Sequence, residues 1–232
     1  MTKYVAIIIY LMTATLLNSQ TTKAINNVDR YLQAYLQKTP VPGFSVSIVE
    51  GDKILFNKGY GVEREGGNKP MTPNSVLNID ALGRGFTSMA ILQLVAQGQL
   101  TLDDLVIKYI PWFQTANKEF SDQITIRMCL SNTSGIPPLF ESMPSLDAQD
   151  GLTTFIKSFD QHVIKRRPGL SHEYCDEGYS IAAYIIEEIT GMSYGDYISQ
   201  NILKPLQMSH STAQYIDDKD IVPGHELSLI HI

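Results

Sequence analysis

The 232-residue sequence predicts an α+β fold in which one antiparallel hairpin is combined with many helices. Three observations carry this prediction. Apolar residues recur at helical spacing over residues 28–36, apolar and polar residues alternate over 44–48, and long helical patterns return over 86–97 and 178–190.

Composition sets the outer limits of what the chain can be. Hydrophobic residues make up 44% and charged residues 18%, which is ordinary for a globular protein and excludes collagen-like, coiled-coil and wholly disordered chains. The net charge of -6 gives no basic surface for nucleic acid, so we expect no nucleic-acid partner. The two cysteines, Cys129 and Cys175, allow at most one disulfide, and the sequence leaves their pairing open.

The N-terminal segment has the pattern of a secretory signal. Lys3 precedes an apolar run over residues 4–17, which has the length of a signal-peptide core and is short for a membrane span. We therefore expect residues 1–24 to be a signal peptide and the protein to be exported, periplasmic or extracellular, without a stable membrane span after cleavage. A retained anchor is the alternative.

The first elements after residue 24 are a helix and a hairpin. The amphipathic spacing of residues 28–36 predicts a helix that Pro40 ends. Strands are expected near 43–50 and 53–60, because the first alternates apolar and polar residues and Gly51-Asp52 suits a turn between them.

Helices dominate the remainder. Apolar residues surround the segment 86–97, so we expect a helix that starts near Ala81 and is buried on several sides. A long helix is expected over 178–190, because Gly191 follows a regular apolar stripe. We interpret the neighbouring aromatic residues Trp112 and Phe113 as core anchors.

A series of short stretches, in order along the chain, resembles the serine β-lactamase and penicillin-binding-protein-like hydrolases, in particular the class C β-lactamase-related branch. These stretches are Pro42–Val46, Gly85–Val95, Gly98–Asp104, Ile124–Arg127, Leu130–Pro137, Gly178–Ser180, Thr190–Tyr194 and Ile202–Met208. The resemblance implies a β-lactamase/transpeptidase-like fold with an antiparallel sheet flanked by helices and an all-helical subdomain.

The resemblance also suggests how the chain is divided. We expect residues 25–226 to be a partial domain of this family, with the helix and hairpin of the sheet region in 25–75 and a mainly helical region in 76–215. Residues 227–232 do not resemble the family, and we interpret them as a foreign tail after a truncation that removes C-terminal strands. A natural divergent tail is the alternative.

The family's chemistry is acyl transfer through an acyl-enzyme, and the first motif for it is altered here. The resemblance implies a Ser-x-x-Lys at the start of the buried helix, with the serine as nucleophile and the lysine as its proton partner. Aligned on Phe86-Thr87, those positions hold Ala81 and Arg84. Alanine has no nucleophilic atom, and arginine stays protonated and cannot act as a base.

The second motif, Tyr-x-Asn in the family, falls on Tyr174, Cys175 and Asp176. Tyr174 is retained, Asp176 replaces the asparagine, and Cys175 is a candidate pocket thiol whose simpler interpretation is a small residue at a variable position. The family's third motif, Lys/His-Thr/Ser-Gly, does not occur after Asp176. We hypothesise that Arg84 and Asp176 form an ion pair; independent drift into solvent is the alternative.

These substitutions favour a catalytically inactive member of the family, a pseudoenzyme, that binds a cell-wall peptide or a β-lactam-like ligand or regulates an active relative. Three alternatives stay open: an active hydrolase or transpeptidase with an unconventional nucleophile, a truncated fragment without function, and a structural protein of the envelope. We expect a peptidoglycan peptide or a small acyl compound as partner, and no cofactor or metal. The oligomeric state is left open.

Overall fold

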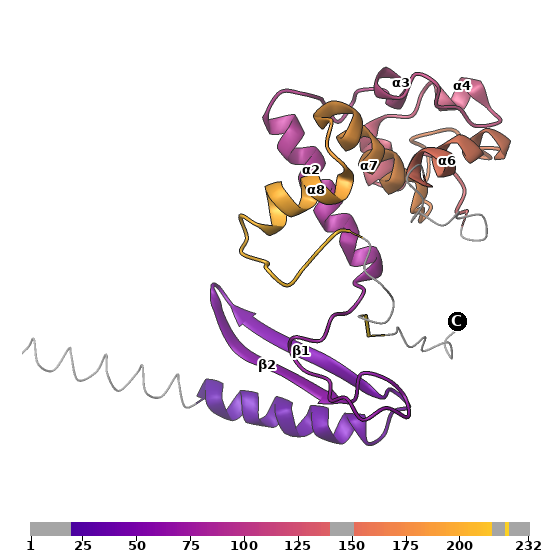
Figure 1. Cartoon of the computed structure of the whole chain (residues 1–232). Helices are drawn as coiled ribbons and strands as arrows, with labels where there is room; N and C mark the ends of the chain where they lie inside the picture. Colours follow the sequence, from indigo (N-terminus) through magenta and orange to yellow (C-terminus); the bar gives the residue numbers. More distant parts are fainter. Residues whose placement is uncertain (1–19, 140–150, 215–220, 223–232) are drawn as a thin grey trace, which may run out of the picture. The chain divides into compact units, whose positions relative to one another are not determined.

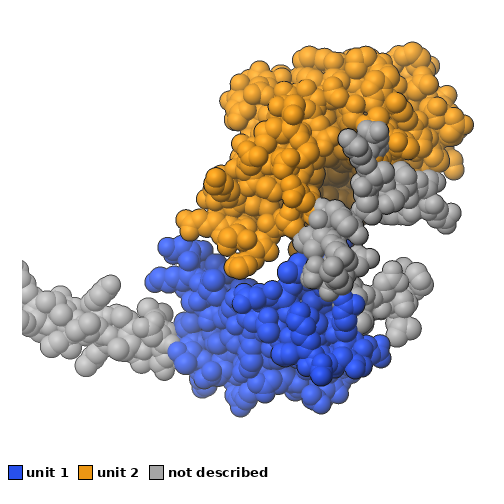
Figure 2. All heavy atoms as spheres, in the orientation of Figure 1, with its two compact units in different colours: residues 1–78, 216–232 blue, residues 79–215 orange. Residues whose placement is uncertain are grey.

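The structure is a computed structural model that describes residues 20–139, 151–214 and 221–222. The chain divides into two compact units, which Figure 2 shows in different colours, and Figure 1 labels the helices and strands along the sequence. The first unit comprises residues 1–78 and 216–232, and the second comprises residues 79–215.

The first unit holds a helix over residues 20–36 and an antiparallel hairpin. Strand β1 (Gly43–Glu50) pairs with β2 (Lys53–Gly61), with Phe44 opposite Tyr60 and Ile48 opposite Phe56. The two predicted strands are therefore confirmed. The helix includes residues 20–24, so it extends across the point where we expect the leader to end.

The helix is fastened to the hairpin by one carboxylate. Asp29 accepts hydrogen bonds from Lys58 Nζ at 2.7 Å and from the Tyr60 hydroxyl at 2.6 Å. The hydrogen bond from Lys58, reinforced by that from Tyr60, holds the pKa of Asp29 below its usual value. Beside this contact, Tyr35 of the helix meets Phe44 of β1 edge to face, with ring centres 6.0 Å apart.

The hairpin contains a bulge near its tip. The register shifts after Ile48, so that Val49 lies opposite Ile54 and Leu55 has no partner residue in β1. Val49 and Ile54 are both exposed. Their neighbours at the tip are the charged residues Glu50, Asp52 and Lys53.

The second unit consists of helices. In chain order they are η1 (Asp80–Gly83), α2 (Arg84–Ala96), α3 (Val106–Tyr109), α4 (Lys118–Ser121), α5 (Ile126–Leu130), α6 (Gly151–Lys157), η3 (Ser158–Gln161), α7 (Glu177–Thr190), α8 (Tyr194–Ile198) and η4 (Ser199–Leu203). The helix expected over 178–190 is thus confirmed as α7, which Gly191 ends in a left-handed conformation with φ 67°.

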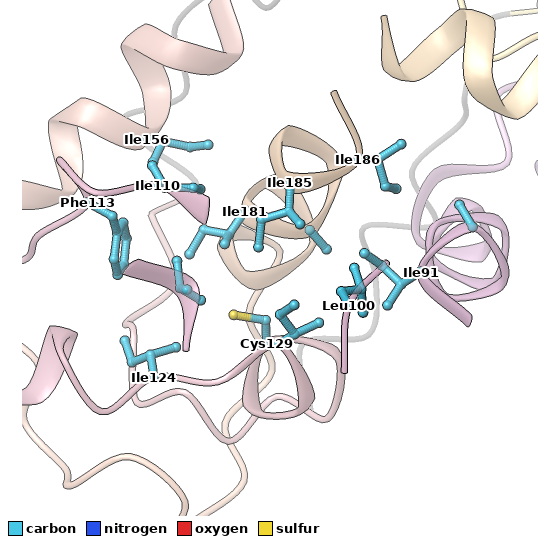
Figure 3. Packing of buried hydrophobic residues seen from close by; sticks show 14 of the residues in the cluster. Ile91, Leu100, Ile110, Phe113, Ile124, Cys129, Ile156, Ile181, Ile185 and Ile186 are labelled. Atoms are coloured by element: carbon cyan, nitrogen blue, oxygen red, sulfur yellow. The ribbon is translucent and has the colours of Figure 1, made fainter. Parts of the chain in front are cut away.

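Helix α7 is the centre of the core of this unit. It packs against α2, α3, α5, α6 and α8, and Ile181 and Ile185 on its inner face are fully buried (Figure 3). Cys129 of α5 lies among these apolar side chains as a free thiol. The position of α7 fixes where its N-terminus, and therefore Asp176, meets the neighbouring helices.

Helix α2 differs from its prediction. One face is buried through Thr87, Ala90, Ile91 and Leu94, but Met89 and Leu92 on another face are 43% and 51% exposed. The expectation of burial on several sides is therefore wrong. Apolar composition shows that a helix can be buried all round, but it does not show which faces have a partner.

Trp112 is a second correction. Phe113 is buried in the core and packs edge to face on Phe159, as expected of an anchor. Trp112 is more than one-third exposed, and its ring meets Tyr184 edge to face with Lys157 above it. Adjacent residues in a turn point in different directions, so only one of the two aromatic rings reaches the core.

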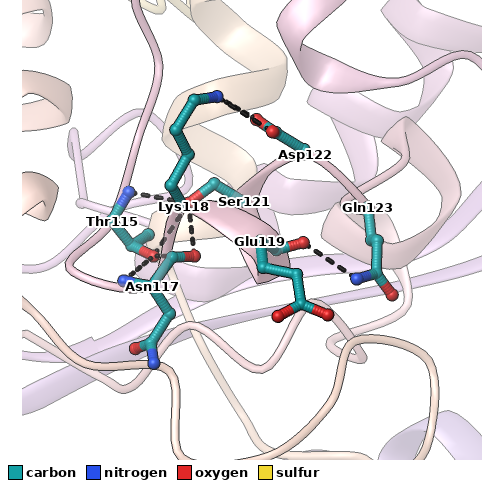
Figure 4. A network of polar contacts seen from close by, with 7 residues as sticks. All are labelled: Thr115, Asn117, Lys118, Glu119, Ser121, Asp122 and Gln123. Carbon is teal, nitrogen blue, oxygen red and sulfur yellow. Dashed lines mark hydrogen bonds and ion pairs between the residues drawn. The ribbon is translucent and has the colours of Figure 1, made fainter.

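A polar network organises the start of α4 (Figure 4). The Ser121 hydroxyl accepts a hydrogen bond from the Thr115 N–H at 2.8 Å and donates to the carbonyl of Asn117 at 3.2 Å, while Lys118 pairs with Asp122 one turn later. The network satisfies the hydroxyl groups of Thr115 and Ser121 and the carbonyl of Asn117, and its role is structural. Within residues 20–139, 151–214 and 221–222, no helix combines the length and apolar character that a membrane crossing requires.

Candidate functional site

The candidate site lies within the second unit, where the start of α2 meets the segment before α7. Ala81 is in the 3-10 turn η1, and Arg84 is the first residue of α2. The predicted helix start near Ala81 is confirmed in this form: a 3-10 turn that continues into an α-helix. The two positions of the altered first motif are thus placed one turn apart, half-buried, at the beginning of a long helix.

The segment Glu173–Asp176 is held against the turn that follows α5. The N–H of Glu173 donates to the carbonyl of Asn132 at 2.9 Å, and the N–H of Cys175 donates to Asn132 Oδ1 at 3.4 Å. Asn132 has φ 56°, in the left-handed region that asparagine tolerates better than most residues. Asn132 therefore accepts hydrogen bonds from the segment of the second motif with both its main-chain carbonyl and its side chain.

Arg84 and Asp176 form the ion pair that the sequence analysis hypothesised. Nη2 of Arg84 donates to Oδ1 of Asp176, and the two side chains are 14% and 31% exposed. Drift of both side chains into solvent is excluded by this contact. Asp176 stands at the N-cap of α7 but makes no side-chain capping bond, because its carboxylate is turned to Arg84.

Two tyrosine rings enclose the guanidinium. The central carbon of Arg84 lies 3.8 Å from the centre of the Tyr174 ring and 5.0 Å from that of Tyr179. The Tyr179 hydroxyl donates to the carbonyl of Leu130 at 2.7 Å, which fixes this ring. Nε of Arg84 is buried without a hydrogen-bond partner, so the pair with Asp176 does not use this nitrogen.

The electrostatics keep Arg84 charged. Burial by itself lowers the pKa of Arg84, but the hydrogen bond and charge of Asp176 outweigh it and leave the pKa above its usual value. A guanidinium in this state cannot accept a proton from a neighbouring group. Ala81 has no reactive atom, so neither of the two positions that the resemblance assigns to the nucleophile and its proton partner holds the type of group that the family uses.

Cys175 does not behave as a pocket thiol. It is 1% exposed, and its Sγ–H donates to Oε2 of Glu177 at 3.0 Å. Burial, and after it the hydrogen bond to Glu177, raises the pKa of the thiol. Cys175 is a predicted ligand contact, but its side chain faces the interior of the unit and has no surface that a ligand could touch in this structure.

Sequence reasoning missed two residues of this site, Tyr179 and Glu177. Tyr179 lies three residues after Asp176, a spacing that places it on the same side of the first helical turn, so this signal was present. Glu177 is a charged residue that is 1% exposed, and no pattern in the sequence indicates that it faces inward. In the described part of the chain no cluster of His, Cys, Asp and Glu could hold a metal ion.

The chain is similar to known proteins in both sequence and fold. Residues 28–217 match the family described as Beta-lactamase. The protein named Protein flp of Staphylococcus aureus strain MW2 is 33% identical over 204 residues, which are 86% of this chain and 41% of that protein. The chain spans less than half the length of this curated relative.

Solved structures give the same result for the fold. FmtA from Staphylococcus aureus is 28% identical with a TM-score of 0.68, over 80% of this chain and 49% of that one. A class C β-lactamase in complex with cefoxitin has a TM-score of 0.74 at 23% identity, over 90% of this chain and 57% of that one, and supports the fold alone. The β-lactamase/transpeptidase-like fold is therefore confirmed.

Proposed function

The chain belongs to the Beta-lactamase family, and from this premise we propose that it is a catalytically inactive member, a pseudoenzyme that forms no acyl-enzyme. The observation that carries the proposal is the state of the first motif. The resemblance assigns Ala81 to the nucleophile position, and the guanidinium of Arg84 is paired with Asp176 and contacts two tyrosine rings. A family reaction that begins with attack by a serine has no group to start it.

The role that remains for the fold is binding or regulation. We propose that the exported protein binds a cell-wall peptide or a small acyl compound without cleaving it, or regulates an active relative. The exposed ring of Tyr174 is the retained residue of the second motif and is the first surface that such a ligand would meet. An unconventional nucleophile is not proposed, because the buried thiol of Cys175 already donates its hydrogen to Glu177.

Covalent labelling tests the absence of an acyl-enzyme. The protein is incubated with a fluorescent penicillin and, separately, with a chromogenic cephalosporin, and intact-mass spectrometry follows the adduct. We expect no adduct and no stoichiometric burst, whereas an active family enzyme labels in parallel. An adduct on the unchanged chain would refute inactivity, and its loss in Cys175→Ala would identify that thiol as the nucleophile.

Non-covalent binding is tested separately. Titration of an acyl-D-alanyl-D-alanine peptide into the isotopically labelled protein is followed by amide chemical shifts. The proposal of peptide binding predicts saturable shifts that are smaller in Tyr174→Leu than in the unchanged protein. Shifts that are absent, or equal in the two proteins, would remove the peptide-binding part and leave the inactivity unaffected.

A further inference from the structure

Glu177 is a buried carboxylate that the proposed function does not use. Its side chain is 1% exposed at the first position of α7. Oε1 accepts a hydrogen bond from the N–H of Leu139, and Oε2 accepts from Sγ–H of Cys175 at 3.0 Å. A carboxylate in this place is stabilised by the helix N-terminus, but its burial is costly unless both oxygens keep their donors.

The segment before α7 alternates between inward and outward side chains. Cys175 and Glu177 face the interior and bond to each other, whereas Tyr174 and Asp176 contact Arg84. The bond between Cys175 and Glu177 fixes these two inward side chains relative to each other, and the N–H of Leu139 ties Glu177 to a neighbouring loop, so that together they oppose rotation of the segment about its own axis. The same rotation would carry Asp176 and the Tyr174 ring away from the guanidinium.

Two further contacts make this arrangement specific. Asn132 holds the main chain of Glu173 and Cys175, so the segment is fixed on its main-chain side as well. The N–H of Leu139 brings a second loop to the same carboxylate. The loop, the thiol and the helix start thus meet at the carboxylate of Glu177.

From these contacts we infer that Cys175 and Glu177 form a thiol–carboxylate clamp whose role is to position Tyr174 and Asp176 on Arg84. Both are positioning residues: they act on the site through the residues between and beside them. This inference rests on the proposed function, because it takes the ion pair between Arg84 and Asp176 as the contact that fills the position of the family's catalytic pair.

The test measures the coupling between Arg84 and Asp176 with and without the clamp. Urea unfolding of the unchanged protein, Arg84→Ala, Asp176→Ala and the double variant gives the coupling as a factor in the unfolding equilibrium constant. The same four proteins are then made in a Glu177→Gln background. We expect a coupling of about fivefold or more in the first set and less than about twofold in the second.

This readout separates positioning from ordinary stabilisation. If Glu177 only stabilised the fold, Glu177→Gln would lower the stability of all four proteins and leave the coupling unchanged, and this result would overturn the inference. Equal coupling in both backgrounds is therefore the decisive negative outcome, whatever the change in overall stability.

A matched pair at Cys175 keeps the inference testable if Glu177→Gln does not fold. Cys175→Ser retains a donor to Glu177, and Cys175→Ala removes it. The readout is the ring-current shift that Tyr174 imposes on the δ-methylene protons of Arg84. We expect the shift to persist in Cys175→Ser and to be lost in Cys175→Ala, and equal shifts in the two variants would contradict the clamp.

The two proposals fail independently. Acyl labelling depends on whether a nucleophile exists, and it is measured with a penicillin. The coupling and the ring-current shift are measured without any ligand. If penicillin labels the protein while Glu177→Gln still abolishes the coupling between Arg84 and Asp176, only the proposed inactivity is refuted. If penicillin does not label the protein and Glu177→Gln leaves this coupling unchanged, only the clamp is refuted.

Discussion

The guanidinium of Arg84 lies 3.8 Å above the ring of Tyr174, so the tyrosine that the resemblance assigns to the second motif is stacked on the arginine that it assigns to the first. The same guanidinium is paired with Asp176. Arginine rather than lysine suits this position, because a planar cation can stack on a ring and bind a carboxylate at its edge at the same time. Arg84, Asp176 and Tyr174 thus form one structural unit.

Removing the charge of Asp176 should destabilise the protein. In Asp176→Asn the cation of Arg84 stays half-enclosed without a counter-charge, and we expect a loss of about 1–3 kcal/mol in the free energy of unfolding. Urea titration measures it. The control Glu119→Gln alters an exposed carboxylate and should change stability by less than about 0.5 kcal/mol. Equal effects would show that the ion pair contributes nothing specific.

The stacked ring of Tyr174 should matter more than its hydroxyl. Tyr174→Leu removes the ring face from Arg84, and we expect a loss of about 0.5–2 kcal/mol, whereas Tyr174→Phe keeps the ring and should stay near the unchanged protein. Chemical denaturation at low and high salt checks both variants. If Phe and Leu are equally destabilising, the ring contact is not the source of the effect.

The two faces of α2 should respond differently to the same substitution. Leu94→Ala opens a cavity in the buried core and should cost about 2–5 kcal/mol. Leu92→Ala, two residues earlier on the exposed face, should cost less than about 1 kcal/mol. Thermal or urea unfolding of the pair measures the difference. Similar losses would mean that the face of Leu92 is covered in solution.

Stability should fall as the pH rises above about 8.5. Burial raises the pKa of the Cys129 thiol to about 12, and the pKa of Cys175 is raised as well. The unfolded chain releases these protons near pH 8.5, while the folded chain keeps them, so the folded state loses stability between that pH and about 12. We expect a loss of about 1 kcal/mol for each thiol at pH 9.5.

The control for this pH dependence is Cys129→Ala. Urea titrations at pH 7.5 and 9.5 should show a smaller pH-dependent loss in this variant than in the unchanged protein. The window stops at pH 9.5 because half-buried tyrosines such as Tyr194, whose pKa burial also raises, contribute above it. An identical slope for both proteins would contradict a thiol origin.

Local patterns predicted the elements well, because they depend on residues close in sequence. The alternation Phe44-Ser45-Val46 led to β1, and the stripe ending at Gly191 led to α7. The pair of Arg84 and Asp176 was also predictable, since the resemblance placed both positions in one site and their charges are opposite.

Long-range packing was not predictable in the same way. Whether Met89 and Leu92 are covered depends on what lies against that face of α2, and their hydrophobicity does not contain this information. Glu177 is buried because two neutral donors reach it, one of them from Leu139, 38 residues away along the chain. A charged residue becomes an interior one only through such partners, which a single sequence does not display.

The bulge after Ile48 has a consequence for the protein in concentrated solution. By shifting the register it brings Val49 opposite Ile54, and because both side chains are exposed, the hairpin tip carries a small apolar patch. Although the bulge interrupts the regular ladder and so opposes strand addition, an exposed apolar patch favours association with another molecule, the first step of fibril-like assembly. Glu50, Asp52 and Lys53 surround it with charge and act as gatekeepers, so neutralising them should make the chain prone to self-association.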